Sequence, residues 1–163
     1  EANSCGMYYA NSGADMRELV KYVNHLNFHA CWDTGHGNYT QGLDEFKEYA
    51  DQYAMITKIG KRLKATHIHD NMSRPFGDKS TDPDSHWLPF DGTFDYHEMM
   101  RKLDKYGYAG PLLLEVYRNA RADYKQLTPE EFIVTSYDRI KRISTLNDLY
   151  NTKRNILPEF GSV

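Results

Sequence analysis

Residues 65–71 of the chain read Ala65-Thr66-His67-Ile68-His69-Asp70-Asn71, which is typical of a short buried strand. Because side chains alternate along a strand, His67 and His69 are expected on one face and Ile68 on the other. Two imidazoles on one face, with the Asp70 carboxylate next in line, suit half of a metal or acid–base site. A hydrogen-bonded histidine pair in the core is the alternative explanation of the same residues.

Helices and strands are expected to alternate around this strand. The spacing of apolar residues predicts helices at 14–26, 42–64 and 95–106 and from Pro129 to about residue 151. Further strands are predicted at 28–32 and 112–117, and a long loop at 71–93. The residues predicted to face inward include Leu26, Tyr96, Met99, Met100, Leu103, Phe132, Ile133, Tyr137 and Ile143. Strands that alternate with helices predict right-handed βαβ units and a parallel sheet.

Composition limits the possible function classes. The chain has 163 residues, enough for one domain with a sizeable core, and a formal net charge of −3. This charge is not the basic footprint of a nucleic-acid-binding protein, and no apolar run approaches the roughly 20 residues that span a bilayer. Cys5 and Cys31 belong to no paired-cysteine motif, which favours a reducing, cytoplasmic location.

Potential metal ligands stand at or just after four successive strand ends: Glu1, Asp33, His36, His69 and Glu115. In parallel α/β folds these strand ends meet at one edge, where functional sites lie. Crowded carboxylates and imidazoles are costly unless a positive charge neutralises them, and a divalent cation does so. Two Glu, one Asp and one His suit Mn²⁺, Mg²⁺ or Co²⁺, with Zn²⁺ as an alternative.

Four short motifs, in this order and spacing, resemble the sugar phosphate isomerase/epimerase superfamily, the xylose isomerase-like TIM barrels that include endonuclease IV. They are Trp32-Asp33-Thr34-Gly35-His36-Gly37-Asn38, Thr66-His67-Ile68-His69-Asp70-Asn71, Asp84-Ser85-His86-Trp87-Leu88-Pro89-Phe90-Asp91-Gly92-Thr93-Phe94-Asp95 and Tyr106-Gly107-Tyr108-Ala109-Gly110-Pro111-Leu112-Leu113-Leu114-Glu115-Val116. The resemblance covers nearly the whole chain. It implies that residues 1–163 form a single domain, the C-terminal half of a (β/α)8 barrel from the end of strand five through helix eight.

The resemblance also implies roles for individual residues. Matched position by position, the metal ligands are Glu1, Asp33, His69 and Glu115. The substrate contacts are His36, which would touch a hydroxyl, Arg74, which would hold the far end of the substrate, and His86. Asp84 and His86 also match the Asp-x-His ligands of a second metal in the xylose isomerase and endonuclease IV branches. His67 is expected to be a structural hydrogen-bond partner.

The implied activity is a metal-dependent isomerase or epimerase acting on a sugar, sugar phosphate or polyol through an enediolate. Glu1 and Glu115 would take and return the proton on opposite faces of the substrate. Two alternatives stay open: an endonuclease IV-like DNA-repair nuclease, against which the net charge speaks, and a non-catalytic half-barrel fragment. A half-barrel exposes two sheet edges, so it is expected to pair with a missing N-terminal half or to form a homo-oligomer.

Overall fold

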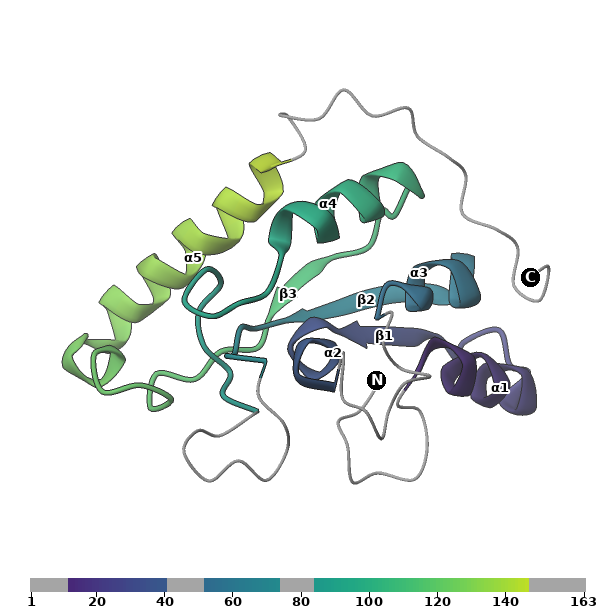
Figure 1. Cartoon of the computed structure of the whole chain (residues 1–163), viewed down its shortest axis with the longest axis horizontal. Helices are drawn as coiled ribbons and strands as arrows, with labels where there is room; N and C mark the ends of the chain where they lie inside the picture. The colour runs from purple at the N-terminus through teal and green to yellow at the C-terminus, as the bar shows by residue number, and fades with distance from the viewer. Residues whose placement is uncertain (1–11, 41–51, 74–83, 147–163) are drawn as a thin grey trace.

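The computed structural model describes residues 12–40, 52–73 and 84–146 (Figure 1). Within them, one sheet contains three parallel strands in the order β1-β2-β3, which are β1 (Ala30–Asp33), β2 (Leu63–Ile68) and β3 (Leu112–Leu114). The register pairs Asp33 with His67 and His67 with Leu113. The parallel α/β arrangement predicted from the sequence is confirmed, and the carboxyl ends of all three strands meet at one edge.

The described helices are α1 (Gly13–Val23), α2 (Thr34–Thr40), α3 (Ala54–Ile59), α4 (Tyr96–Lys105) and α5 (Pro129–Thr145), with 3₁₀ turns at η2 (Gly60–Arg62) and η3 (Tyr124–Gln126). Three of them begin with a side-chain cap, because Ser12, Asp95 and Thr128 each accept a hydrogen bond from a backbone N–H three residues on. At the start of α5, Thr128 and Glu131 form a capping box in front of Pro129, where the sequence predicts the helix to begin. None of the described helices has the length and apolar character needed to cross a membrane.

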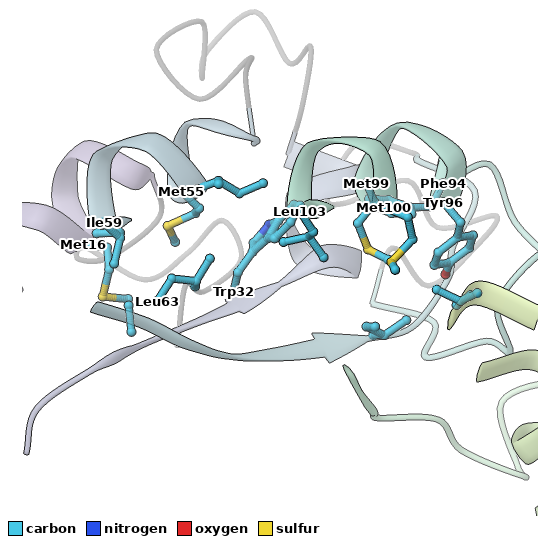
Figure 2. Close-up of a cluster of buried hydrophobic side chains, with 14 of the residues drawn as sticks. Met16, Trp32, Met55, Ile59, Leu63, Phe94, Tyr96, Met99, Met100 and Leu103 are labelled. Atoms are coloured by element: carbon cyan, nitrogen blue, oxygen red, sulfur yellow. The ribbon is translucent and has the colours of Figure 1, made fainter. Parts of the chain in front are cut away.

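The core lies between the sheet and the helices that cover one of its faces (Figure 2). Trp32 of β1 and Ile68 of β2 are buried there against α3 and α4. The four residues of α4 predicted to face inward, Tyr96, Met99, Met100 and Leu103, are all buried. Leu113 of β3 points to the opposite face and is 50 % exposed, so among residues 12–40, 52–73 and 84–146 the helices leave this face of β3 open.

The helix predicted at residues 42–64 is shorter at its C-terminal end. The described part, α3, stops at Ile59, and Gly60 adopts a φ of 56° that ends the helix. The chain then makes the 3₁₀ turn η2, and β2 starts at Leu63, which is buried in the core. Residues 42–51 of the predicted helix lie outside the described residues.

Three inward positions were predicted wrongly. Ile133 and Tyr137 of α5 are 66 % and 61 % exposed, because the buried side of α5 is centred on Phe132 and Ile143 instead. Leu26 is 82 % exposed, because α1 ends at Val23 and Asn24 takes a left-handed conformation. The α5 helix ends at Thr145, and the predicted extension to about residue 151 lies outside the described residues from 147 on.

The strands are shorter than predicted, and an additional helix begins directly after Asp33. The strand predicted at 112–117 stops at Leu114 because the Tyr117 N–H donates to the carbonyl of His86, in a loop, at 3.1 Å. The residues directly after Asp33 form the first turn of α2. Gly35 in this helix brings the backbone against the His69 ring.

Candidate metal centre

The loop after β2 is tied back onto the strand end by Asp70. The backbone groups of Asp70 and Trp87 exchange two hydrogen bonds, at 2.9 and 3.0 Å. The Asp70 carboxylate accepts hydrogen bonds from the backbone N–H groups of Asn71, Phe90 and Phe94. Burial raises the pKa of this carboxyl, and the amide hydrogen bonds offset only part of that rise. The backbone and the carboxylate of Asp70 therefore both hold the loop that carries Asp84 and His86.

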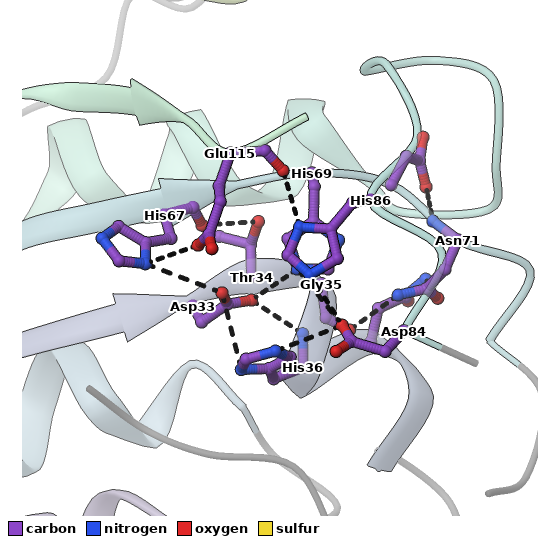
Figure 3. Close-up of polar contacts among 12 residues, drawn as sticks. Asp33, Thr34, Gly35, His36, His67, His69, Asn71, Asp84, His86 and Glu115 are labelled. Atoms are coloured by element: carbon purple, nitrogen blue, oxygen red, sulfur yellow. Dashed lines mark hydrogen bonds and ion pairs between the residues drawn. The ribbon is translucent and has the colours of Figure 1, made fainter. Parts of the chain in front are cut away.

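Asp33 stands at the centre of the site, at the end of β1, and is 1 % exposed (Figure 3). Its carboxylate lies 3.0 Å from His69 Nε2, 3.5 Å from His36 Nδ1 and 3.9 Å from His67 Nδ1. It also accepts the backbone N–H of His36 at 2.8 Å, which holds the first turn of α2. Burial raises the pKa of Asp33, but its contacts with His69 and His36 lower it more, so the net pKa is below the usual range. The expectation that His67 and His69 share a face is met, because both contact Asp33.

Asp84 brings the loop into the same site. Its Oδ1 atom lies 3.1 Å from His86 Nε2 and 3.2 Å from His36 Nε2. The two imidazoles outweigh the effect of burial and hold the pKa of Asp84 far below its usual range. His86 Nδ1 is 2.8 Å from the backbone carbonyl of Glu115, which can only accept, so Nδ1 carries a proton; in the neutral ring Nε2 then presents a lone pair to Asp84. A lone pair that faces a carboxylate oxygen needs a proton or a cation between them.

Glu115 follows β3 by one residue, and its backbone N–H donates to the carbonyl of Ile68 at 3.1 Å. Its Oε2 atom lies 2.7 Å from His67 Nδ1. His67, expected to be a structural hydrogen-bond partner, thus contacts the Glu115 carboxylate, and its Nδ1 atom is also a candidate metal ligand. The signal that could have revealed this was the alternation that places His67 on the same face as His69.

Two groups of side chains have donor atoms that all lie within 4.8 Å of one another. The first, called the Asp84 group, contains His36, His69, Asp84 and His86, and the second, called the Glu115 group, contains Asp33, His67 and Glu115. Both ring nitrogens of His69, which is 0 % exposed, and Oδ2 of Asp33 are buried without a well-formed hydrogen bond in the described part of the chain. Buried polar atoms in this state need a partner, and a divalent cation would satisfy them. The chemistry of these residues therefore fits a divalent ion. The predicted ligands are divided between the two groups, because His69 belongs to the Asp84 group and Asp33 and Glu115 belong to the Glu115 group.

Five of the seven site residues predicted from the sequence come together here: Asp33, His36, His69, His86 and Glu115. The structure also adds Asp84, which matched the second-metal motif. Glu1 and Arg74, predicted as a metal ligand and a substrate contact, lie outside the described residues. One aromatic neighbour of the site, Tyr117, had no predicted role.

Residues 2–142 match the sequence model of a family described as the xylose isomerase-like TIM barrel. The chain belongs to this family. The predicted family and fold are therefore confirmed, and the three described strands are part of such a barrel.

Individual relatives of this barrel family are longer than the chain. The protein y4fM of Sinorhizobium fredii, named as uncharacterized, is 31% identical over an alignment of 119 residues that covers 67% of this chain and 33% of y4fM. A xylose isomerase domain protein from Alicyclobacillus acidocaldarius subsp. acidocaldarius has a TM-score of 0.60 at 23% identity, over 86% of this chain and 45% of that chain. A D-tagatose 3-epimerase-like protein has a TM-score of 0.48 at 22% identity, over 85% and 47%. The chain thus spans from a third to about half of the length of these relatives.

The protonation of His86 predicts a pH dependence of stability in the metal-free xylose isomerase-like chain. Burial lowers the pKa of His86, but its contacts with Asp84 and the Glu115 carbonyl raise it more, so the net pKa is above its usual value. A raised folded-state pKa contributes stability that is fully present below about pH 6.5 and is lost as pH rises through the folded pKa. In urea unfolding with a chelator present, we expect the free energy of unfolding to fall more between about pH 6 and about pH 9 in the wild type than in His86→Gln.

The matched control for this measurement is His97→Gln, because His97 is exposed on α4. It should keep the pH dependence of the wild type. An identical pH dependence in His86→Gln and the wild type would contradict the raised pKa.

Proposed function

We propose that this chain contributes the metal-binding strand ends of a metal-dependent isomerase or epimerase that acts on a sugar, sugar phosphate or polyol. The observation that carries the proposal is the convergence of carboxylates and imidazoles from three strand ends and one loop around the buried Asp33. Membership in the xylose isomerase-like family supports the same chemistry. A cytoplasmic location and a role in carbohydrate metabolism belong to this proposal.

Asp33, His69 and Glu115 would hold the divalent ion (Mn²⁺, Mg²⁺, Co²⁺ or Zn²⁺), with Glu1 as the fourth ligand predicted from the sequence. When bound, the ion acts as a Lewis acid that makes the proton next to a sugar carbonyl easier to remove. Glu115 takes this proton at its carboxylate, which His67 Nδ1 orients from 2.7 Å, and leaves the substrate as an enediolate. Glu115 would keep this proton, and a protonated Glu1 would donate a proton of its own from the opposite face, which would give the epimer or isomer.

His36 is the substrate-binding residue of this proposal. Its ring lies between two carboxylates, with Nδ1 3.5 Å from Asp33 and Nε2 3.2 Å from Asp84. These two contacts restrain the orientation of the His36 ring at the start of α2. In this proposal the ring would also contact a substrate hydroxyl, as the resemblance implies. The far end of the substrate would be held by Arg74, as the resemblance implies.

A nuclease of the endonuclease IV type is the second candidate function. It is favoured by the Asp84 group, in which three imidazoles and one carboxylate form a set that suits Zn²⁺ or Co²⁺ better than Mg²⁺. Such a set, beside the Glu115 group, provides donors for more than one ion. The formal net charge of −3 argues against a surface that binds DNA.

We also propose that the chain works as one part of a closed barrel, either with an N-terminal half-barrel or with a second copy. One edge of β3 has no neighbouring strand among the described residues, and Leu113 of this strand is half exposed. A complete barrel needs eight strands. The length of the relatives is compatible with further strands outside this chain.

The test is elemental analysis of metal per chain, in protein purified without chelator, for the wild type and Glu115→Gln. The control is Glu130→Gln, because Glu130 is exposed in the first turn of α5. About one ion per chain, lost in Glu115→Gln but kept in Glu130→Gln, together with epimerisation in a screen of sugars and polyols, would support the proposal. The native mass of the same sample gives the number of copies.

Two other results would overturn the isomerase proposal. Two or three zinc ions per chain with cleavage of duplex DNA at abasic sites, and without sugar turnover, would establish the nuclease instead. No bound metal after soaking in excess Mn²⁺, Co²⁺ and Zn²⁺ would show that the chain is a non-catalytic half-barrel.

A further inference from the structure

Three aromatic rings from separate segments form a continuous stack beside the candidate metal centre. The His86 ring lies on the His69 ring with centroids 3.9 Å apart and planes 12° apart. The Tyr117 ring lies against His86 at 4.2 Å and 17°. His69 is buried at the end of β2, His86 belongs to the following loop, and Tyr117 comes two residues after Glu115. His86 is thus enclosed on one side by a candidate ligand and on the other by a tyrosine.

The segment that carries Tyr117 also holds His86 through its backbone. The Tyr117 N–H donates to the His86 carbonyl at 3.1 Å, and the Glu115 carbonyl accepts from His86 Nδ1 at 2.8 Å. His86 itself has a φ of 49°, a left-handed conformation that a non-glycine residue keeps only when its surroundings enforce it. The loop conformation of His86 therefore depends on residues 115–117.

We propose that the Tyr117 ring is a positioning element of the Asp84 group, which keeps His86 in the orientation and tautomer that a bound cation requires. A flat ring on each side prevents the imidazole from turning about its bond to Cβ. In the stacked position Nδ1 stays on the Glu115 carbonyl, and the Nε2 lone pair stays 3.1 Å from Asp84 Oδ1. Without the tyrosine ring, one face of His86 is open and the imidazole is able to rotate away.

The proposal assigns the effect to the ring of Tyr117, because the stacking contact involves the ring face. Tyr117 is 48 % exposed, so its removal leaves the hydrophobic core intact. Tyr117→Phe keeps the stack, whereas Tyr117→Leu and Tyr117→Gln remove it. The matched control is Tyr137→Leu, which removes an exposed tyrosine ring from α5, away from the site.

The first measurement needs no metal. Long-range ¹H–¹⁵N correlation spectra of the imidazole rings, recorded with chelator at about pH 9, report which ring nitrogen carries the proton in neutral histidine. We expect His86, assigned by its loss in His86→Gln, to be fixed as the Nδ1–H tautomer in the wild type, Tyr117→Phe and Tyr137→Leu. Tyr117→Leu and Tyr117→Gln should show averaging between the two tautomers.

The second measurement is Co²⁺ titration of the same proteins, followed by visible absorption. Removal of a residue that contacts and orients a metal ligand lowers metal affinity about 10- to 100-fold. Tyr117→Leu and Tyr117→Gln should therefore bind an ion at the Asp84 group at least about ten-fold more weakly. Tyr117→Phe and Tyr137→Leu should retain the wild-type affinity and spectrum.

This inference rests on the proposed function only where the metal is concerned, and the two can fail separately. A fixed His86 tautomer in Tyr117→Leu and Tyr117→Gln would overturn the positioning role, and so would equal losses in Tyr117→Phe and Tyr117→Leu. Absence of Co²⁺ binding in the wild type, with the expected tautomer changes in the variants, would overturn the proposed function and keep the positioning role.

Discussion

We expect Asp33→Asn to weaken binding of Co²⁺ or Mn²⁺ by at least about 100-fold and to abolish turnover of any sugar substrate. The substitution keeps the volume of the side chain, so the buried site should retain its shape. Asparagine removes the negative charge that faces His69 at 3.0 Å, His36 at 3.5 Å and His67 at 3.9 Å. Residues that only contact and orient metal ligands already contribute about 10- to 100-fold to metal affinity. A buried carboxylate that is itself a ligand should contribute more.

The measurement is a Co²⁺ titration monitored by calorimetry and by visible absorption. Asp138→Asn is the matched control, because Asp138 is an exposed carboxylate on α5 and its loss should leave affinity unchanged. Asp33→Asn still accepts the His36 N–H through its amide oxygen, so α2 should remain folded. Wild-type affinity in Asp33→Asn would show that Asp33 orders the histidines without binding the ion.

The second large effect is expected from Gly35→Ala. Alanine is favoured over glycine in a helix by about 1 kcal/mol, so propensity alone predicts that this change stabilises α2. A Cβ at residue 35, however, would overlap the ring of His69, which is fully buried and has no room to move. Overpacking of a filled interior costs about 1–3 kcal/mol, and steric overlap with His69 therefore outweighs helix propensity.

We expect Gly35→Ala to lower the melting temperature by roughly 2–10 °C and to weaken metal binding, because His69 must shift from Asp33. Gly37→Ala in the same helix is the matched control. Its Cβ would meet mainly the Oε1 end of the Gln52 side chain and, less closely, Gln52 Cβ, whereas a Cβ at residue 35 would overlap the His69 ring; the cost of Gly37→Ala should therefore be smaller. Thermal unfolding followed by circular dichroism tests both. If Gly35→Ala is as stable as Gly37→Ala, the packing of α2 against His69 is looser than the structure indicates.

The wrong prediction on α5 has a long-range physical cause, unlike the helix ends at Asn24 and Gly60, which are local. The inner side of α4 was predicted correctly because its four apolar residues recur with the helical period and nothing competes with them. On α5 the apolar Ile133 and Tyr137 suggested a second inward stripe, but Arg139, which bonds the carbonyl of Pro89 and the Asp91 carboxylate, orients that helix differently. Such a contact, between residues about fifty positions apart, leaves no trace in the local pattern of either segment.

The sequence by itself determined the alternation of helices with three parallel strands, the start of α5 and the gathering of Asp33, His69 and Glu115 at one sheet edge. These features follow from periodicity, from local hydrogen bonds and from the geometry of parallel strands, which act over a few residues or apply to any α/β sheet. Only the tertiary structure decided the rest. It placed Asp84 between His36 and His86, joined His67 to Glu115 and stacked Tyr117 on His86. Apart from the Asp84–His86 pair, those contacts join residues that are about 30 to 50 positions apart. Their geometry is set by how the loop after β2 folds back through the Asp70 hydrogen bonds.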